Sequence, residues 1–462
     1  MKYVSTRGEA PSLDFADVTL TGLASDGGLY VPEEWPRFSS EEIGAMRGLP
    51  YVELAARVMQ PFVGECLTPE RLRELTDRAY GRFAHKGVTP LVQLNEQHWV
   101  LELFHGPTLA FKDVALQMLG LLFEEFLKRE EGNLTIVGAT SGDTGSAAID
   151  AVAGLDNVEI FMLHPKGRVS EVQRRQMTTV LDDNVHNIAI EGNFDDAQAM
   201  VKASFADQGF LQGTQLIAVN SINWARIMAQ IVYYVASAVA LGAPHREVSF
   251  TVPSANFGNL FAGYMAKRMG LPVKQFVIAT NANDILHRTL ADNDFSKQTL
   301  KATLAPSMDI VVSSNFERLL FEAYDRDAAA VADLLTRFQQ SPTALHEAPL
   351  AELRALFGSH SVDDDTIIEV IREAFEHTGE LLDPHTATGY RAAQRARADT
   401  VTPMITLATA HPAKFEDAVV KAGFEGAPLP ENMHDLMARE ERYDVLPAEL
   451  KAVQAYVAEH RH

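Results

Sequence analysis

The stretch that decides the fold is Phe104–Gly120, "FHGPTLAFKDVALQMLG", which places Lys112 where an apolar helix is predicted to begin. Lysine prefers the surface, because burying its ammonium group without a partner is costly. A cation at a helix N-terminus also opposes the helix dipole. Lys112 is therefore either a solvated charge in the first helical turn or a nucleophile held in a pocket, where it can form a Schiff base with a carbonyl cofactor. This stretch alone leaves both interpretations open.

The composition is that of an acidic globular protein. The chain has 462 residues, a hydrophobic content of 47% and a formal net charge of −22, with an isoelectric point near 5.1. This length allows two or three domains. Because no long basic run is present, we predict neither a nucleic-acid partner nor a membrane-surface partner. An acidic protein can still bind an anionic substrate through helix N-termini and a few well-placed Arg or Lys residues.

Cysteine usage and hydropathy favour a cytoplasmic location. Cys66 is the only cysteine, so neither a disulfide framework nor a cysteine zinc site can be built. The N-terminal residues lack the apolar region of a secretory signal. The most apolar segment, residues 227–243, falls short of the ~20 apolar residues of a membrane span and is predicted to be a buried helix. The HExxH and DxDxDG patterns are absent, so we predict no metal site.

From Lys112 outward, helical and strand-like segments alternate along the chain. Short β-rich runs and amphipathic helical runs follow one another from residue 112 to about 219, and a second series covers about 247–280. This alternation predicts βαβ units and a mostly parallel sheet. The segment from about 318 to 380 is mostly helical in pattern and is predicted to be an insertion. A last apolar run, 402–412, is expected to end the β pattern.

Three loops follow predicted strands, and in open α/β sheets the ligand binds beyond the carboxyl ends of the strands. Ala139–Ala148, "ATSGDTGSAA", and Ser254–Asn259, "SANFGN", offer hydroxyls, backbone amides and a helix N-terminus to a carboxylate or phosphate. The second loop lacks the P-loop and GxGxxG patterns, so it suits a cofactor phosphate that is held and never transferred. Either loop could equally be an ordinary strand-to-helix turn. In the third loop, the Thr409 hydroxyl could bond a ring nitrogen, whereas His411 alone is more often structural.

Several motifs together resemble the threonine synthases, which are pyridoxal-phosphate enzymes of fold type II. "HGPTLAFKD" resembles their lysine motif, and the resemblance extends collinearly over nearly the whole chain through "YVSTRG", "GLASDGGLYVP", "GATSGDTGSAA", "NSINWARIMAQ", "PSANFGN", "ATNANDIL", "DPHTATG" and "LATAHPAKF". It is closest to the longer, bacterial and fungal-type members. The lysine motif and the N-terminal signature are specific, whereas related dehydratases share the Gly-rich loops.

The resemblance implies an α/β fold like that of the tryptophan synthase β subunit, with two open, mostly parallel sheets, an N-terminal domain and a helical insertion. The expected domains are residues 1–88 at the N-terminus, a large cofactor-binding domain of 89–112 and 222–462 with the insertion at about 318–380, and a small α/β domain of 113–221.

The resemblance also implies the residues that bind pyridoxal phosphate. Lys112 would form the Schiff base, and Thr409 would hydrogen-bond the pyridine nitrogen, which a neutral hydroxyl leaves unprotonated. Asp143 stands where relatives carry an Asn facing the ring hydroxyl. The cofactor phosphate would sit on the loop Ala255, Asn256, Phe257, Gly258 and Asn259. Because that loop more usually begins with glycine, Ala255 argues against a positive φ at its position.

The implied reaction is O-phospho-L-homoserine plus water giving L-threonine plus phosphate, by γ-elimination and addition of water at Cβ, with Lys112 moving the protons. The substrate carboxylate would be bound by Thr140, Ser141 and Thr144. Candidates for the substrate phosphate are Arg226, Asn315, Arg318, Lys414 and the 141–145 loop. We expect a cytoplasmic monomer or homodimer.

Two alternative functions fit the same motifs. One is another fold type II lyase, such as a Ser/Thr dehydratase or a phospho-amino-acid lyase, which product analysis would separate. The other is a non-catalytic relative that only binds a phosphorylated metabolite, and the absence of a visible cofactor band would favour it.

Overall fold

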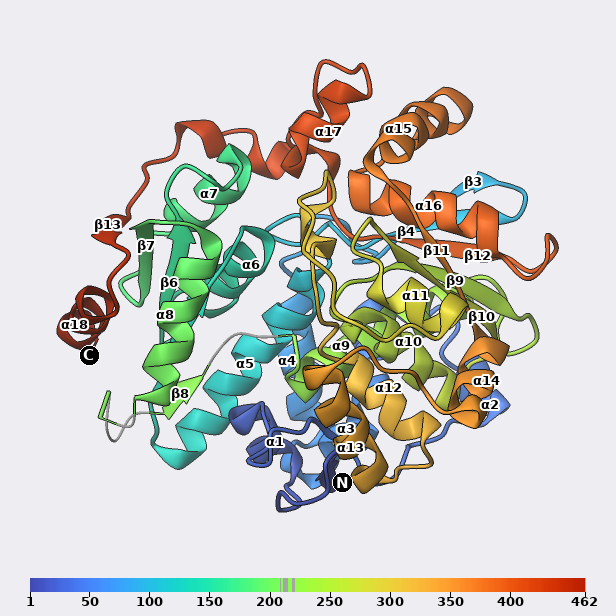
Figure 1. The fold of residues 1–462 in the computed structure, drawn as a ribbon, viewed down its shortest axis with the longest axis horizontal. Coiled ribbons are helices and arrows are strands. Elements are labelled where there is room, and N and C mark those ends of the chain that lie inside the picture. Colours follow the sequence, from blue (N-terminus) through green and yellow to red (C-terminus); the bar gives the residue numbers. More distant parts are fainter. Residues whose placement is uncertain (208, 211–214, 218–220, 462) are drawn as a thin grey trace.

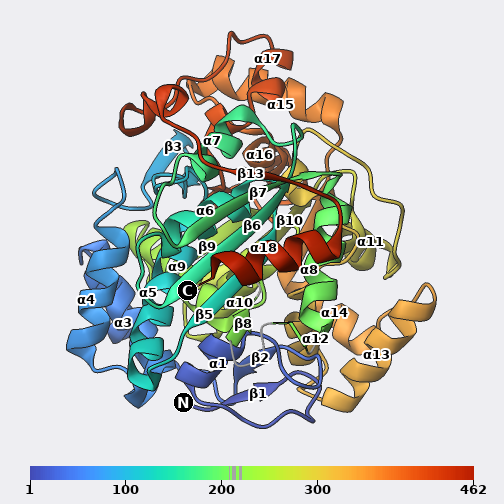
Figure 2. The same ribbon diagram turned by 90° about the vertical axis from the view of Figure 1, so that its left-hand side faces the viewer.

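The computed structural model describes residues 1–207, 209–210, 215–217 and 221–461. Within these ranges the strands form three sheets, of two, six and five strands. Figure 1 shows the two larger sheets side by side, each covered by helices, and Figure 2 shows the two-stranded sheet below them, near the N-terminus. The α/β class and the two mostly parallel sheets are as predicted.

The N-terminal segment is a small sheet with four α-helices. Strand β1 (Tyr3–Ser5) pairs antiparallel with β2 (Tyr30–Pro32). Two of these helices begin with side-chain caps: Ser39 and Glu42 form a capping box, and Thr68 accepts from the backbone N–H of Arg71. The helices are α1 (Phe15–Thr21), α2 (Ser40–Gly44), α3 (Tyr51–Val63) and α4 (Pro69–Tyr80), with a 3₁₀ turn at Gly64–Cys66.

The six-stranded sheet has the order β11-β10-β9-β12-β4-β3. All neighbours are parallel except the antiparallel hairpin of β3 and β4. Its strands are β3 (Leu91–Asn95), β4 (His98–Glu102), β9 (Val248–Pro253), β10 (Val273–Thr280), β11 (Phe357–Ser361) and β12 (Met404–Ala408). The helices between residues 224 and 421 are α9 (Trp224–Ala240), α10 (Gly258–Arg268), α11 (Ile285–Asp292), α12 (Phe316–Ala323), α13 (Ala328–Gln340), α14 (Glu347–Leu356), α15 (Asp364–Thr378), α16 (Pro384–Ala396) and α17 (Glu416–Lys421). Short 3₁₀ turns lie at Pro306–Met308, Pro412–Lys414, Glu431–Met433 and Leu436–Ala438.

The five-stranded sheet is parallel throughout, in the order β13-β7-β6-β5-β8. Figure 2 looks onto this part of the molecule, with α18 and α8 lying across the strands. The elements are α5 (Lys112–Glu130), β5 (Leu134–Ala139), α6 (Asp143–Val152), β6 (Val158–Pro165), α7 (Glu171–Thr178), β7 (Val185–Glu191), α8 (Phe194–Ala206), β8 (Gln215–Ile217), β13 (Asp444–Pro447) and α18 (Leu450–His460). The strand predicted at 215–219 is seen as β8, and its residues 218 and 219 lie outside the described ranges.

One sequence prediction about the strands is wrong. Strand β13 pairs with β7, so the β pattern does not end at 412, and the C-terminal segment joins the five-stranded sheet instead of the six-stranded one with the rest of 222–462. The segment at 318–380 is mostly helical, as predicted, but it also contains β11, an edge strand paired with β10. Both β11 and β13 are short edge strands, and such strands carry little of the apolar alternation that reveals a strand.

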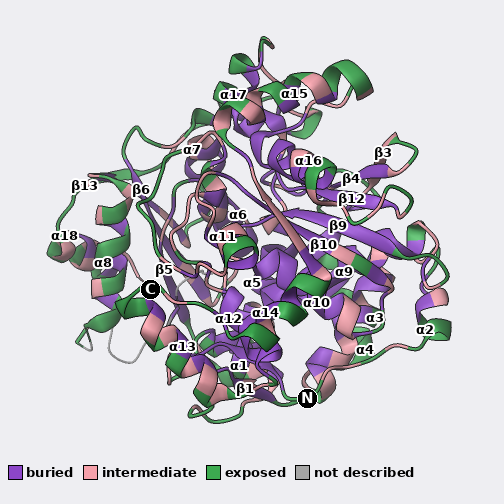
Figure 3. Ribbon diagram, turned by 45° about the vertical axis from the view of Figure 1, so that its right-hand side comes forward, coloured by how far each residue is buried: buried purple, intermediate pink, exposed green. Residues whose placement is uncertain are grey.

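Helix α9 is the buried helix predicted from residues 227–243. Nearly every residue from Trp224 to Val239 is buried, and in Figure 3 the helices around α9 and α5 are purple while the outer helices turn green faces to solvent. Helix α5 packs against both α6 and α9, so it joins the helices of the two large sheets. Among the described residues, no helix is long and apolar enough to cross a membrane.

Candidate active site

Lys112 is the first residue of α5, and a folded-back loop fixes its position. Thr108 donates to Asp113 twice, from its backbone N–H at 2.8 Å and from its hydroxyl at 2.5 Å. Asp113 is fully buried in the first helical turn, where a carboxylate favours the helix dipole. The Lys112 side chain is 12% exposed. The solvated interpretation of Lys112 is therefore wrong, because its side chain is largely buried.

The end of β12 lies directly beside this loop. The backbone N–H of Phe111 donates to the carbonyl of Thr409 at 2.9 Å, and that of His411 donates to the carbonyl of Leu109 at 3.0 Å. Thr409 is buried. The structure therefore brings Thr409, predicted from a strand end 297 residues away along the chain, next to the residue that precedes Lys112.

Asp143 joins two lysines inside the site. Its Oδ2 lies 3.1 Å from Nζ of Lys112, and its Oδ1 lies 2.8 Å from Nζ of Lys414. Gln173 donates to Oδ1 at 2.9 Å and Ser307 donates to Oδ2 at 3.0 Å. Both carboxylate oxygens are thus satisfied, and the side chain is only 5% exposed.

These contacts set the charges of the cluster. Burial lowers the pKa of Lys112, with the cations Lys414 and Arg226 adding to the effect while Asp143 opposes it. Burial by itself raises the pKa of Asp143, but the two lysines outweigh it and hold that pKa well below its ordinary value. Lys112 is therefore a lysine whose neutral, nucleophilic form is made more accessible, and Asp143 is a permanent carboxylate.

The 254–259 loop joins β9 to α10 and is anchored through its carbonyl groups. Ser313 donates to the carbonyl of Ala255 at 2.6 Å, and Asn315 donates to the carbonyl of Asn256 through both its backbone N–H and its side-chain Nδ2, each at 2.9 Å. The first N–H groups of a helix have no acceptor within the helix. The amides at the start of α10 are therefore the donors that this loop can offer to an anion.

Two side chains show that this loop fits a phosphate. The Oδ1 atom of Asn259 accepts from the hydroxyls of Tyr233 at 2.6 Å and Tyr234 at 2.9 Å, which orients the amide. Its Nδ2 atom, and the hydroxyl of Ser254, are buried without a hydrogen-bond partner among the described residues. Buried polar atoms are rarely left unsatisfied. A cofactor phosphate would supply the missing acceptor, so the residues present fit the group.

One residue of this loop, Phe257, has a strained backbone conformation. Phe257 has φ +63°, in the left-handed region that a bulky residue rarely adopts. Ala255, where relatives usually carry glycine, does not have positive φ, as the sequence argument expected. A Cβ atom added to Gly258 would lie 3.3 Å from both Asn315 Nδ2 and Ile227 Cδ1. A side chain at position 258 would therefore press on the protein atoms behind the loop.

The three residues predicted for the substrate carboxylate share the turn that carries Asp143. The Thr140 hydroxyl accepts from the N–H groups of Gly142 at 3.0 Å and Gly145 at 2.9 Å, so it shapes the turn. Gly142 has φ +146°, and a Cβ atom there would lie 2.4 Å from the Gln173 side chain. The turn also includes Ser141, which is exposed, and Thr144, which is partly buried. Their contact with substrate stays a prediction.

The candidates for the substrate phosphate separate into two groups. Arg226 is buried in α9 near enough to Lys112 to repel its charge. Arg318 is fully buried elsewhere: its Nε donates to the carbonyl of Tyr30 at 3.0 Å, and its Nη2 donates to that of Ile222 at 2.6 Å. It also bonds Asn315, which itself holds the 254–259 loop. These contacts give Arg318 and Asn315 structural roles, and their contact with the substrate stays a prediction.

Sequence reasoning missed Gln173 and Ser307, the two neutral partners of Asp143. The backbone N–H of Ser307 also donates to Nε2 of His385 at 3.1 Å, while Nδ1 of His385 lies 2.6 Å from Asp383. Asp383 and His385 lie in "DPHTATG", one of the motifs that carried the resemblance. The "DPH" motif could therefore have indicated the Asp383–His385 pair that holds Ser307. No sequence feature near Ser307 itself indicated that it contacts Asp143.

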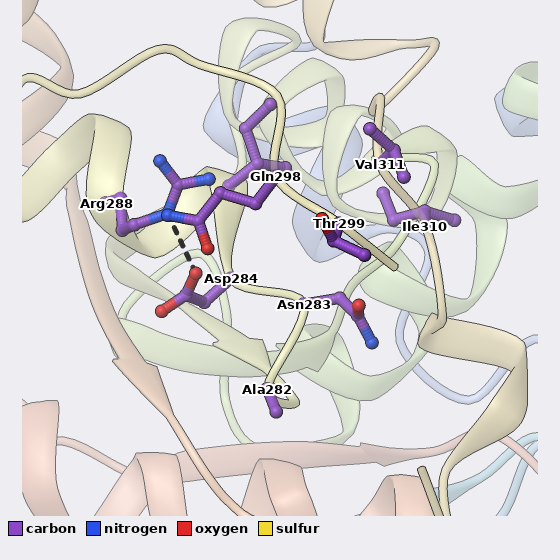
Figure 4. Close-up of a pocket in the computed structure, with 9 residues that line it drawn as sticks. Ala282, Asn283, Asp284, Arg288, Gln298, Thr299, Ile310 and Val311 are labelled. Atoms are coloured by element: carbon purple, nitrogen blue, oxygen red, sulfur yellow. Dashed lines mark hydrogen bonds and ion pairs between the residues drawn. The ribbon is translucent and has the colours of Figure 1, made fainter. Parts of the chain in front are cut away.

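Two cavities lie apart from Lys112. Figure 4 shows a polar pocket of about 10 Å³, room for about one water, where Arg288 donates to Asp284 at 2.9 Å. A second cavity, of about 340 Å³, borders the 312–316 segment that holds the 254–259 loop. Its other lining residues are Arg7, Leu23, Leu29, Ser221, Ile222, Phe295, Glu317, Leu335, Phe338 and Gln339.

A largely buried lysine, a loop that fits a phosphate and a strand-end threonine, set at the carboxyl ends of strands in two mostly parallel sheets, define a pyridoxal-phosphate-dependent enzyme of fold type II. The family profile described as "Pyridoxal-phosphate dependent enzyme" matches residues 83–335. Profiles described as "Threonine synthase N terminus" and "Threonine synthase, C-terminal" match residues 2–80 and 386–457.

Individual relatives show which family of fold type II enzymes the chain resembles. The chain is 60% identical to threonine synthase from Pseudomonas aeruginosa, over 100% of this chain and 98% of the relative. The crystal structure of PLP-bound threonine synthase from Brucella melitensis superimposes with a TM-score of 0.98 at 53% identity, covering 100% of this chain and 99% of that one. The yeast threonine synthase structure gives 0.95 at 39% identity, covering 99% and 98%. The chain belongs to the threonine synthase family, and its cofactor is pyridoxal phosphate.

Proposed function

We propose that this chain converts O-phospho-L-homoserine and water to L-threonine and phosphate, as a phosphate-eliminating carbon–oxygen lyase. The observation that carries the proposal is the buried cluster of Lys112, Asp143 and Lys414, which lies where the ends of β5 and β12 meet the start of α5. The family match over the whole chain supports it.

The chain's own residues supply a complete set of cofactor contacts. The Lys112 amine would attach to the cofactor carbonyl, the 255–259 loop would bind the phosphate, Asp143 would face the ring hydroxyl and Thr409 the ring nitrogen. When bound, pyridoxal phosphate supplies an electron sink for negative charge that develops on the substrate carbons. The unsatisfied donors Ser254 and Asn259 support this placement of the phosphate.

Lys112 is proposed as the group that moves protons at Cα, Cβ and Cγ. A general base needs a neutral form near neutral pH, and burial together with neighbouring cations lowers the pKa of Lys112 in that direction. Asp143 would stabilise the ammonium group each time Lys112 takes a proton. Because Ser307 and Gln173 also hold Asp143, the carboxylate stays in place when Lys112 moves.

The electrostatics of the site favour an anionic substrate. Lys112 and Lys414 both bond Asp143, and the buried Arg226 lies near enough to Lys112 to repel its charge, in a protein whose overall charge is −22. We propose Arg226 for the substrate phosphate, and Thr140, Ser141 and Thr144 for the substrate carboxylate. The last three lie on the same turn as Asp143.

We also propose a division into an N-terminal domain of 1–88, a large domain of 89–112 and 222–443, and a small domain of 113–221 completed by the C-terminal segment. The pairing of β13 with β7 supports the last assignment. A cytoplasmic location and a monomeric or homodimeric state are proposed as well. Gel filtration with light scattering would test the second of these.

The function is tested by mixing the purified chain with pyridoxal phosphate and O-phospho-L-homoserine. We expect the cofactor's visible absorption to change on adding the substrate, with L-threonine and phosphate released in equal amounts. A 2-oxo acid and ammonia in place of threonine would identify a dehydratase-type lyase. A chain without a visible cofactor band would be a binding protein only.

A further inference from the structure

Lys414 is a second buried lysine in the cluster around Lys112. Its side chain has 0% exposure, and Nζ donates to the carbonyl of Thr108 at 2.6 Å in addition to its 2.8 Å ion pair with Asp143. It lies in the 3₁₀ turn after β12, whereas Lys112 starts α5 and Asp143 starts α6. Three separate elements therefore bring two ammonium groups and one carboxylate together.

The two lysines use different oxygens of the same carboxylate. Lys112 lies at Oδ2 and Lys414 at Oδ1, so neither displaces the other. A buried carboxylate that loses its only cationic partner becomes strongly unfavourable. Lys112 must change its charge and its bonding if it carries the cofactor and moves protons, but Lys414 has no such duty. A second, permanent cation would therefore keep Asp143 ionised throughout.

We propose that Lys414 is a positioning residue that keeps Asp143 a fixed carboxylate and, through charge repulsion, keeps the Lys112 amine available in its neutral form. This rests on the proposed role of Lys112. It differs from the earlier prediction that Lys414 binds the substrate phosphate, because full burial against Asp143 and Thr108 accounts for its ammonium group without a ligand.

Other charged or titratable groups also face the cluster. Arg226 on α9 repels the charge of Lys112, Asp113 on α5 and His411 at the end of β12 interact electrostatically with Lys414, and His385 on α16 holds Ser307. Burial lowers the pKa of His411 to about 4, so it is neutral around pH 7. Lys414 is the cation bonded directly to Asp143 besides Lys112.

The test measures the pH dependence of Lys112 acylation in the full chain after the cofactor has been removed. The chain is treated with acetic anhydride and Lys112 is quantified on its own peptide. Lys414→Gln removes a neighbouring cation, so the midpoint of Lys112 reactivity should move up by about one pH unit, making acylation about tenfold slower below it. Lys414→Arg, which keeps the charge, should move it less. Lys421→Gln, at an exposed lysine of α17, is the matched control and should move nothing.

A second readout uses the holoenzyme, in which the pH dependence of the visible cofactor absorption should shift in Lys414→Gln and not in Lys421→Gln. The proposal would be overturned if Lys414→Gln left both titration midpoints unchanged and raised KM for O-phospho-L-homoserine. That result would support the earlier prediction that Lys414 binds the substrate phosphate. Because the acylation assay needs no turnover, its result is independent of whether threonine is the product.

If Lys414→Gln is too unstable to purify, stability is compared in the Lys112→Gln background, where Lys414 is the cation that remains at Asp143. Removing both members of a buried ion pair costs less than removing one. Adding Asp143→Asn to Lys112→Gln/Lys414→Gln should therefore raise the Tm, measured in cell lysate if necessary. An equal or lower Tm would mean that Lys414 does not stabilise the Asp143 carboxylate.

Discussion

The Nζ atom of Lys112 lies 3.1 Å from Oδ2 of Asp143, with both side chains largely shielded from water. This ion pair explains how a cation is tolerated at the start of the apolar helix α5. Asp143 offsets its charge from outside the helix, and the buried Asp113 offsets the unfavourable dipole from within the first turn. The same contact places the amine where a cofactor carbonyl could meet it.

Asp113 should make stability depend on pH. Burial raises its pKa to about 6, against the opposing hydrogen bonds from Thr108, whereas an unfolded Asp titrates near about 3.9. The folded chain therefore binds the extra proton between about pH 4 and pH 6, and this group's contribution to the free energy of unfolding falls as pH rises through that window. Above it the cost is on the order of 3 kcal/mol.

Asp113→Asn should remove that cost and still bond Thr108. We expect it to raise the free energy of unfolding at pH 8, by up to about 3 kcal/mol, and to change it little at pH 4. Guanidinium denaturation at pH 4, 6 and 8 measures this. Asp417→Asn, at an exposed aspartate, is the control. A stability difference that is the same at all three pH values would show that the buried charge is not its origin.

Gly258→Val should weaken cofactor binding. The added side chain would press on Asn315 and Ile227, which lie 3.3 Å from the position of its Cβ atom, and overpacking of this kind costs about 1–3 kcal/mol. If this strain distorts the phosphate-binding loop, it corresponds to a roughly tenfold to hundredfold higher Kd for pyridoxal phosphate. Cofactor titration followed by fluorescence measures it. Gly132→Val, where the Cβ atom would meet Leu127 at an ordinary 3.5 Å, should bind normally; equal affinities would place the phosphate elsewhere.

Substitutions of Arg318 and Arg226 should have different effects on KM for the substrate. Arg318→Met leaves the carbonyls of Tyr30 and Ile222 without their donor, so it should lower stability by about 1–3 kcal/mol and leave KM for O-phospho-L-homoserine unchanged. Arg226→Gln should raise KM about tenfold, because it removes a charge proposed for the substrate phosphate. Steady-state kinetics and thermal melts of both variants check this. A raised KM in a folded Arg318→Met would restore its predicted role in substrate binding.

Thr409 should tune the cofactor ring. If its hydroxyl faces the pyridine nitrogen, Thr409→Asp should protonate that nitrogen, change the visible spectrum and slow turnover about tenfold or more. Thr409→Ser keeps the hydroxyl and should be much milder. Spectra and single-turnover rates distinguish the two. An unaltered spectrum in Thr409→Asp would mean that the threonine only caps its strand.

The sequence indicated the fold because most of its elements carry strong local signals. The runs that became β5, β6, β9 and β10 are apolar and alternate with longer helical runs. Strands β11 and β13 were missed because they are short edge strands whose pairing depends on partners far away in the chain. Local pattern does not encode such pairing.

Site residues that lie in sequence motifs could be predicted, whereas site residues that are positioned only by tertiary packing could not. Lys112, Asp143, Thr409 and the 254–259 loop came from motifs at strand ends, and the structure brings the first three together. The burial of Arg318 was not readable, since an arginine in an amphipathic helix looks the same whether it bonds solvent or backbone carbonyls. Ser307 holds Asp143 from an irregular loop 164 residues further along the chain, and no pattern marks that contact.

The most direct test of the central role of Lys112 is reduction of the purified holoenzyme with borohydride, followed by peptide mapping. We expect the cofactor to be trapped on the peptide that contains "AFKD", with its mass on Lys112, and no turnover in Lys112→Ala. Lys414 serves as an internal comparison, since it lies on the other oxygen of Asp143 and should carry no label. Cofactor trapped on Lys414, or on any lysine other than Lys112, would contradict the assignment.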